Sequence, residues 1–351
     1  MSLRLAAATT LALLTLTPAL ASAQIEINAR AATITFGGRL QTQYSVSSID
    51  GADNDFFTRR ARMIAEVRVN DFLSGRVQPD FAGGTIALKD AYFEMTFSEV
   101  FALTIGQFKR PFDLFGLASS TELAMIERDG RIEGLSTCTG VGSICSHSRF
   151  TESLGYSDRD MGVRVSGASG QLSYQAALTN GTGGDNLDEN DAKSVSGRVT
   201  YDVNEDVRVS GQIALHDYVD AAGNATGVAL GGDVEVGTYR DGLLVQASLI
   251  SGDNWRALDA QLDPATFITF QGLAAYYAPL SGGRFAAFEP MLRVSYGDPD
   301  TGTDDDSGIL ITPGVSLYIM GRNKIGVNLD YYSPQSGSEE FSLKIQSFLY
   351  F

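Results

Sequence analysis

The chain has 351 residues, with 42 acidic and 26 basic side chains and a formal net charge of −16. Such an acidic chain would repel a polyanion, so we expect no nucleic-acid partner. Hydrophobic residues make up 44% of the sequence, and 38 residues are glycine, a composition that does not by itself demand a conventional core.

The first 23 residues, MSLRLAAATTLALLTLTPALASA, have the layout of a secretory signal peptide. Arg4 provides the positive charge, an apolar run follows from Leu5 to Leu16, and Ala21-Ser22-Ala23 is a small-residue cleavage site. The alternative, a membrane anchor, needs a run of ~20 apolar residues, which neither this segment nor any later one reaches. We therefore expect an exported chain that begins at Gln24, with the loss of Arg4 taking the net charge from −16 to −17.

After the signal peptide, apolar and polar residues alternate with a period of two, which is typical of β-strands. In RNKIGVNLDYYS, for example, Ile325, Val327 and Leu329 alternate with Lys324 and Asn328. Many alternating segments exceed the usual five or six residues of globular strands, and their length suits tilted strands that cross a hydrocarbon layer. The pattern predicts sixteen strands, at 32–47, 55–69, 73–82, 85–97, 100–109, 158–168, 171–179, 192–202, 206–217, 227–240, 243–252, 266–278, 284–297, 308–320, 323–333 and 339–351.

The connectors between these strands alternate in length. After even-numbered strands they are short, as in DFL, SE, SG, NED, DG, LSGG and GRN. After odd-numbered strands they are mostly longer, as in SSIDGADND, NGTGGDNLDEND, DYVDAAGNATG, DNWRALDAQLDPAT and GDPDTGTDDDSG, with AGGT as the exception. This alternation favours a closed antiparallel transmembrane β-barrel over a soluble all-β fold, because one side of a membrane barrel carries trimmed turns. An even strand number also closes the sheet without a free edge.

The chain ends in EEFSLKIQSFLYF, which places Phe341, Ile345 and Phe351 on one side and Lys344 and Gln346 on the other. A frayed polar tail would be the ordinary expectation for a terminus. We predict instead that the last strand pairs with the first, ITFGGRLQTQY, to close the barrel.

One connector, from residue 110 to residue 157, is far longer than the others. It contains many apolar residues, among them Phe112, Phe115 and Ile126, that need a place to pack. Connectors of this length are usually functional, and we expect this third long loop to fold into the lumen as a constriction. The alternative is a surface cap without a role in gating. Cys138 and Cys145 are the only cysteines, and in an exported chain they predict a local disulfide rather than a metal pair. No metal site and no cofactor are expected.

Charged residues in the strands occupy the face opposite the apolar ones, and charge is costly against lipid, so they are expected to point into the barrel. Cations collected along a narrow water-filled path would attract anions. The alternative is that many of them pair with inward acids such as Glu66 and only stiffen the wall. The candidate anion path consists of Arg60, Arg62, Arg68, Arg76, Lys109, Arg128, Arg131, Arg164, Arg198, Arg208, Arg293 and Lys344.

Acidic residues gather in the long connectors, as at Asp185–Asp191 and Asp298–Asp306. They are expected to be solvated, with divalent cations that bridge lipopolysaccharide phosphates as the alternative. An enzyme is not expected, because His147 and His216 are the only histidines and neither lies in a recognisable nucleophile motif.

Several stretches resemble the phosphate-selective porin O and P family of outer-membrane channels. They are FGGRLQTQY, FFTRRARM, PDFAGGTIALKDAYFEMTF and LTIGQFKRPFDLFGLASSTELAMIER, all within residues 36–131. The resemblance implies a 16-stranded homotrimeric barrel in the cell outer membrane, with the third loop inside and a basic lumen. It also implies that a final strand ending in phenylalanine, here Phe351, is recognised by the barrel assembly machinery.

This sequence departs from the family in lacking a lysine-rich constriction. From Lys109 to Arg159 there are six cations (Lys109, Arg110, Arg128, Arg131, Arg149, Arg159) and seven acids (Asp113, Glu122, Glu127, Asp129, Glu133, Glu152, Asp158). We therefore expect a porin for passive diffusion of small hydrophilic solutes, with a modest preference for anions such as phosphate. The alternative is an outer-membrane barrel that acts mainly as an adhesin or structural protein, in contact with lipid and lipopolysaccharide in either case.

Overall fold

The computed structural model describes residues 25–29, 32–52, 54–132, 134, 135, 138, 141, 145–188, 190–220, 223–258 and 263–351. The predicted signal peptide and Gln24 lie outside these residues. The described part forms two short α-helices, α1 (Leu114–Leu117) and α2 (His147–Ser153), and a 3-10 turn, η1 (Ala82–Gly84). Its strands are β1 (Ile25–Ala29), β2 (Ala32–Ser47), β3 (Asp55–Arg68), β4 (Leu73–Asp80), β5 (Ala87–Ser98), β6 (Phe101–Lys109), β7 (Arg159–Ser169), β8 (Leu172–Thr179), β9 (Ser194–Asp202), β10 (Val207–Asp220), β11 (Gly223–Thr238), β12 (Asp241–Leu258), β13 (Pro264–Pro279), β14 (Ala287–Asp298), β15 (Gly308–Met320), β16 (Asn323–Pro334) and β17 (Glu340–Tyr350).

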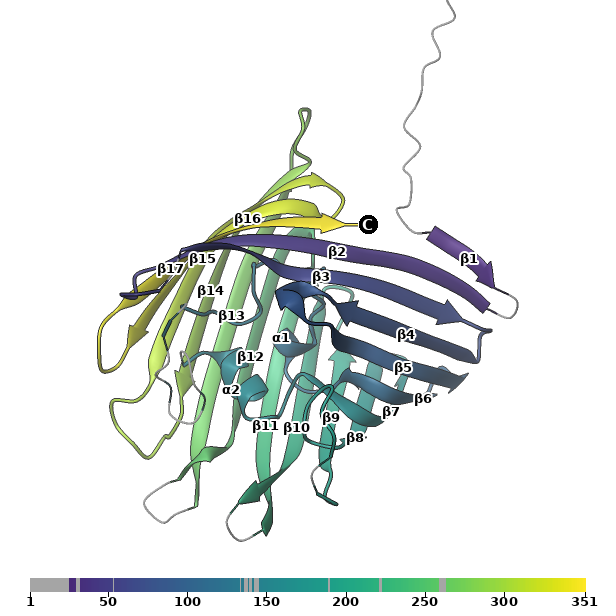
Figure 1. Cartoon of the computed structure of the whole chain (residues 1–351), viewed down its shortest axis with the longest axis horizontal. Coiled ribbons are helices and arrows are strands. Elements are labelled where there is room, and N and C mark those ends of the chain that lie inside the picture. Colours follow the sequence, from purple (N-terminus) through teal and green to yellow (C-terminus); the bar gives the residue numbers. More distant parts are fainter. Residues whose placement is uncertain are drawn as a thin grey trace, which may run out of the picture.

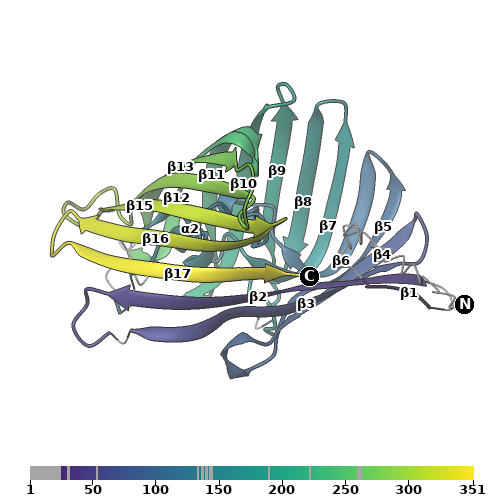
Figure 2. The same ribbon diagram turned by 90° about the horizontal axis from the view of Figure 1, so that it is seen from above.

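Strands β2 to β17 form a closed barrel in which each strand is antiparallel to its sequence neighbours. The ring closes where β17 pairs with β2, from Ser342 opposite Ser47 to Tyr350 opposite Arg39. Figure 1 shows the ring from the side, and Figure 2 shows β17 between β16 and β2. The predicted closed 16-stranded antiparallel barrel is therefore confirmed. Among the described residues, no helix is both long and apolar enough to cross a membrane.

The alternation that predicted the strands also separates their two faces. On β17, Phe341, Ile345 and Leu349 are exposed on the outside, whereas Lys344 and Gln346 are at most 1% exposed. The outward residues form the apolar surface that a membrane barrel needs, and the inward residues are polar. The predicted strands 32–47 and 308–320 coincide with β2 and β15.

Two of the predicted long connectors are shorter in the structure than the sequence indicated. The ladder between β10 and β11 continues through Tyr218 opposite Ala225 and ends with Asp220 opposite Gly223, so most of DYVDAAGNATG is strand. Likewise, β12 runs to Leu258, which takes up much of DNWRALDAQLDPAT. Glycine, asparagine and aspartate indicated loops here, but the hairpin ladders satisfy the backbone groups and override that local preference.

A short strand that the alternation did not predict, β1, extends the sheet at the end of the barrel. It pairs with the first residues of β2, from Ile25 opposite Phe36 to Ala29 opposite Ala32. The C-terminal strand leaves this part of β2 unpaired, because its last backbone hydrogen bonds join Phe351 to Gly38 (2.7 and 3.2 Å). Strand β1 thus occupies the edge of β2 beyond the point where β17 stops.

The connector between β6 and β7, residues 110–158, is called the long connector below. Its buried apolar side chains pack against the inner faces of β10 to β16. One cluster joins Phe112, Ile132, Cys138, Val141, Cys145, Phe150, Leu154 and Tyr156 of the connector to Ala214, Ala229, Ile250, Phe267, Leu310 and Tyr332 of the strands. A smaller cluster joins Phe115, Ala124 and Met125 to Leu273, Ala275 and Met291. The packing explains why a connector of this length contains so many apolar residues.

Candidate functional site

A cavity of about 770 Å³ lies on the inner side of β2 to β8, beside the long connector. Its lining contains eight cations and two acids: Arg39, Arg62, Arg76, Lys109, Arg128, Arg159, Arg164 and Arg322, with Glu66 and Asp90. We call it the lower cavity, because Phe351 and residues near the short turns also line it. So large an excess of positive side chains around one space favours the entry of an anion.

A smaller cavity of about 160 Å³, the upper cavity, lies toward the long-connector end. Its lining contains seven cations and four acids: Arg59, Arg60, Arg62, Lys89, Arg128, Arg131 and Arg159, with Asp113, Asp129, Glu152 and Asp158. Three arginines, Arg62, Arg128 and Arg159, line both cavities. These three are called the shared arginines, and they lie where the two cavities adjoin.

The strand arginines among these three are held by carboxylates. Arg62 Nε donates to Asp80 at 2.6 Å, and Arg159 Nε donates to Asp90 at 2.7 Å. Arg128 belongs to the long connector, and its Nε donates to the carbonyl oxygen of Ala118 at 2.9 Å. Burial, together with the positive charges of Arg60, Arg159 and Arg62, lowers the pKa of Arg128 to about 10. Cations that repel one another in this way would be stabilised by an anion placed between them.

An irregularity in β3 brings two consecutive arginines to one carboxylate. The register between β2 and β3 shifts by one residue between Gln41 and Thr42, which is the signature of a β-bulge. As a result, both Arg59 and Arg60 contact Glu127 of the long connector, and Arg60 NH2 lies 2.7 Å from Glu127 Oε2. The two guanidinium groups hold the pKa of Glu127 well below its usual range despite burial. Strict alternation predicted Arg60 on this face and could not predict Arg59.

The predicted path residues fall into distinct places. Arg60, Arg62, Arg76, Lys109, Arg128, Arg131 and Arg164 line the upper or the lower cavity. Arg198 and Arg208 line a third cavity, of about 800 Å³, whose lining has five acids and four cations. Arg68, Arg293 and Lys344 are absent from the described lining of all three cavities.

Several of these cations are paired. Arg198 binds Asp233 through two bonds of 2.6 and 2.7 Å, and Arg208 lies between Asp202 and Glu235. Further pairs join Arg76 to Glu66 (2.7 Å), Arg131 to Asp129 (3.6 Å), Arg164 to Glu94 (3.6 Å) and Arg293 to Asp330 (2.9 Å). The side chain of Arg68 is 71% exposed near a short turn, 3.6 Å from Asp71. Pairing with acids, the alternative that the sequence left open, thus applies to each of them, although the partner of Arg68 lies in an exposed turn rather than on the inner wall.

Sequence reasoning missed three cations of the lower cavity: Arg39, Arg159 and Arg322. Arg39 is 4% exposed and donates to Ser120 Oγ at 2.6 Å. Its place in the alternation with Gln41 and Gln43 of β2 was the available signal. Arg322 lies in a short turn, where alternation assigns no face, and pairs with Glu122 at 2.9 Å.

The long connector also carries an acid with an unusual titration. Glu152 lines the upper cavity, and burial together with the charges of Asp129 and Asp158 raises its pKa to about 7. Elsewhere in the connector, His147 Nε2 lies 3.2 Å from Asp113 Oδ1, and Thr151 Oγ1 donates to the other oxygen of Asp113 at 2.8 Å. This buried group joins the N-cap of α1 to α2.

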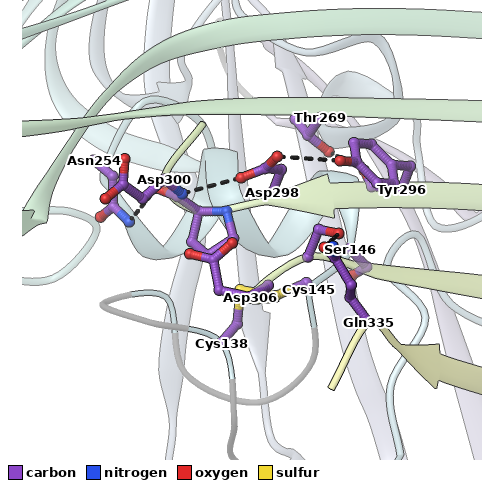
Figure 3. Close-up of a disulfide and its surroundings, with 12 residues drawn as sticks. Cys138, Cys145, Ser146, Asn254, Thr269, Tyr296, Asp298, Asp300, Asp306 and Gln335 are labelled. Carbon is purple, nitrogen blue, oxygen red and sulfur yellow. Dashed lines mark hydrogen bonds between the residues drawn. A yellow bond between two sulfur atoms is a disulfide. The ribbon is translucent and has the colours of Figure 1, made fainter. Parts of the chain in front are cut away.

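Cys138 and Cys145 form a disulfide within the connector, with Cα atoms 5.2 Å apart. It lies beside the acidic connector between β14 and β15, as Figure 3 shows. There the Asp298 carboxylate accepts bonds from the Asp300 amide (3.2 Å) and the Tyr296 hydroxyl (3.1 Å). Within the described part of the chain, no group of three or more His, Cys, Asp or Glu side chains is placed to hold a metal ion.

Solved structures with a similar fold are bacterial outer-membrane proteins. The trimer form of OmpT from Vibrio cholerae gives a TM-score of 0.62 at 13% identity, covering 92% of this chain and 100% of that one. The outer-membrane channel DcaP of Acinetobacter baumannii gives 0.64 at 14%, covering 92% and 99%. OmpF of Salmonella typhi, in complex with daunomycin, gives 0.60 at 13%, covering 93% and 100%. At these identities the likeness establishes the barrel fold.

The sequence, rather than the fold, identifies the family. No curated protein matches the chain significantly. The family model for phosphate-selective porin O and P, however, matches residues 34–263, well over half of the chain. That match extends far beyond the segments at 36–131 on which the resemblance was recognised. Together with the closed barrel, it establishes that the chain belongs to the phosphate-selective porin O and P family and forms a porin channel of the cell outer membrane.

Proposed function

We propose that this porin admits small hydrophilic solutes by passive diffusion, with a modest preference for anions such as phosphate. The observation that most supports the preference is the lining of the lower cavity, with eight cations and two acids. A narrow passage with low-dielectric walls strengthens the field of such charges. The preference for anions is proposed to be modest, because many of the inward cations are paired with acids and the third cavity has a mixed lining.

The proposed path runs from the upper cavity, past the shared arginines, into the lower cavity. Of the predicted path residues, Arg60, Arg62, Arg76, Lys109, Arg128, Arg131 and Arg164 are proposed to lie along it. The long connector is proposed to act as the constriction loop. Support comes from its packing against β10 to β16, which leaves the basic cavities beside β2 to β8.

The surroundings of the channel are also proposed. Exposed outward residues such as Leu40 and Ile345 are proposed to contact outer-membrane lipid, and the acidic connectors to face lipopolysaccharide. A homotrimer is supported by the similarity to OmpT, whose structure is a trimer form. Phe351 is proposed as the signal for the barrel assembly machinery. That the chain is not an enzyme is inferred from its family, whose members form channels.

Conductance of the refolded protein in planar bilayers tests the anion preference. Under a potassium chloride gradient, we expect stepwise single-channel currents and a reversal potential that reports chloride as the more permeant ion. Added phosphate should reduce the chloride current if it occupies the same path. A reversal potential of the opposite sign would refute the anion preference but not the conclusion that the protein forms a channel.

A further inference from the structure

The inward cations differ in what their nitrogen atoms contact, and Arg293 of β14 is the clearest case. It is 2% exposed, and its NH1 donates to the carbonyl oxygens of Glu127 and Arg128 at 3.0 and 3.1 Å. Its NH2 binds Asp330 at 2.9 Å and Thr312 at 3.0 Å. Arg293 thus shares the buried Asp330 carboxylate with Lys344 of β17, while its NH1 donors hold the main chain of the long connector.

Two lysines farther along the barrel, on β16 and β17, hold the same stretch of main chain. Lys324 Nζ of β16 donates to the carbonyl oxygens of Leu123 (2.7 Å) and Ala124 (3.2 Å). Lys344 Nζ of β17 contacts the carbonyl oxygen of Arg131. Both lysines are 1% exposed, and their other acceptors are also fixed groups, the Tyr318 hydroxyl for Lys324 (3.3 Å) and the Asp330 carboxylate for Lys344. Five carbonyls between residues 123 and 131 are therefore held by Arg293, Lys324 and Lys344, which we call the anchoring cations.

Arg128 lies in the middle of the stretch that these cations hold. Its own guanidinium donates to the carbonyl oxygen of Ala118, which also accepts a bond from Lys109 Nζ at 2.8 Å. Lys109 binds the carbonyls of Gly116 and Leu117 as well, at the C-terminal end of α1. Arg128 is therefore fixed at both its main chain and its side chain. Among the described residues, no carboxylate forms an ion pair with it, in contrast to Arg62 and Arg159.

We propose that Arg128 is the selectivity-determining residue of the channel, and that Arg293, Lys324 and Lys344 are positioning residues that act through it. The proposal rests on the proposed anion preference. Arg128 lines both basic cavities, and no described carboxylate lies within ion-pair distance of it, whereas the anchoring cations are absent from the cavity linings and direct their donors to the connector. Removing a charge should therefore have different consequences in the two groups.

A double-mutant cycle measures this difference. Arg128→Gln should lower the chloride-to-potassium permeability ratio by about sevenfold, because a unit charge at roughly 7 Å in water changes the local concentrations of chloride and potassium about 2.7-fold each, in opposite directions. Arg293→Met should lower the ratio less and raise the open-channel current noise, because the freed connector moves Arg128. In the Arg128→Gln background, Arg293→Met should leave the ratio unchanged, since coupled residues are not additive.

A control variant also removes one positive charge but leaves the contacts of the long connector intact. Arg164 lines the lower cavity and contacts Thr104 and Glu94 of neighbouring strands. Arg164→Gln should lower the ratio by the same factor in both backgrounds. If Arg293→Met also lowers the ratio equally in both, it acts as a simple charge and the positioning role is refuted. An unchanged ratio in Arg128→Gln refutes the role of Arg128.

Lys324→Met provides a second route if Arg293→Met fails to assemble. It removes the bonds to Leu123 and Ala124, and it should increase current noise without abolishing the heat-dependent gel mobility of a folded barrel. Steady currents in this variant would overturn the positioning role. If the wild-type channel shows no anion preference, the proposed function fails, but the noise of the Lys324→Met channel still decides whether the connector is anchored in this way.

Discussion

The inner faces of the two halves of the barrel carry different side chains. The wall from β2 to β8 presents arginines such as Arg62 and Arg164 to open cavities, whereas the wall from β10 to β16 presents Phe267, Ile250 and Leu310 to the packed connector. Both walls come from strands with the same outward apolar pattern. Under the proposed function, the wall that packs the long connector limits how much of the lumen stays open, and the wall that carries the arginines determines which ions prefer the opening.

The largest effect is expected at the seam where the two walls meet. The amide and carbonyl of Phe351 pair with Gly38, and a Cβ atom on Gly38 would lie 2.6 Å from the Phe351 ring. Deleting Phe351 should strongly reduce the amount of assembled barrel in outer-membrane fractions, because closure and the proposed assembly signal are lost together. The few channels that do form should change far less in conductance, because Phe351 is only one of the residues that line the lower cavity. Normal amounts of a variant that lacks Phe351 would contradict this expectation.

Removing the long connector should leave both walls of the barrel facing open lumen. We expect replacement of residues 112–156 by a short Gly/Ser linker to raise single-channel conductance several-fold, because the space beside β10 to β16 opens. The anion preference should fall at the same time, since Arg128 and Arg131 are removed and a wider passage weakens the field. Unchanged conductance would show that the connector does not restrict the path.

A smaller effect, on stability, is expected when a side chain is truncated in the half of the barrel that packs the long connector. Phe150 is fully buried and stacks on Phe267, with ring centroids 5.2 Å apart. Phe150→Ala should lower the free energy of unfolding by about 3 to 5 kcal/mol, the usual cost of such a truncation. Urea denaturation followed by tryptophan fluorescence would measure it. Leu187→Ala, at a side chain that is 88% exposed, is the matched control and should have little effect.

The two walls also differ in how far the sequence predicted them. Alternation gave the strands and the inward arginines of β3, β4 and β7, because a lipid-facing strand must keep one face apolar. It did not reveal Arg59, because a β-bulge changes the period locally. Nor did it reveal the apolar inner wall, since Phe267 and Ala214 face a protein segment rather than water. The anchoring contact of Lys324 joins residues 201 positions apart, which no local pattern encodes.

A modest change in selectivity is expected from single charges. Arg159 and Arg208 are both paired, with Asp90 at 2.7 Å and with Asp202 at 2.8 Å, but Arg159 lines both basic cavities whereas Arg208 belongs to the mixed lining of the third cavity. Arg159→Gln should lower the chloride-to-potassium permeability ratio, and Arg208→Gln should change it little. Equal effects of the two substitutions would argue for a diffuse field across the lumen rather than a basic path along one wall.

The smallest expected effect is a pH dependence at the upper cavity. Burial and the charges of Asp129 and Asp158 raise the pKa of Glu152 to about 7, against the opposite effect of Arg149 and Arg128. An acid with a raised pKa is ionised above that pH and neutral below it, so lowering the pH from 8 to 6 removes a negative charge beside the path. The chloride preference should therefore increase as the pH falls through about 7.

Reversal potentials in potassium chloride at several pH values would measure this change without the titration of phosphate itself. Glu152→Gln should give the low-pH preference at every pH between 6 and 8. Asp306 needs a control variant, because burial and neighbouring aspartates raise its pKa to about 6, so that it also titrates in this pH range. Asp306 lies in the connector after β14, outside the basic cavities, so Asp306→Asn should keep the pH response. If Asp306→Asn abolishes the response and Glu152→Gln does not, the titrating charge acts at the mouth of the barrel and the upper cavity is not where selectivity is tuned.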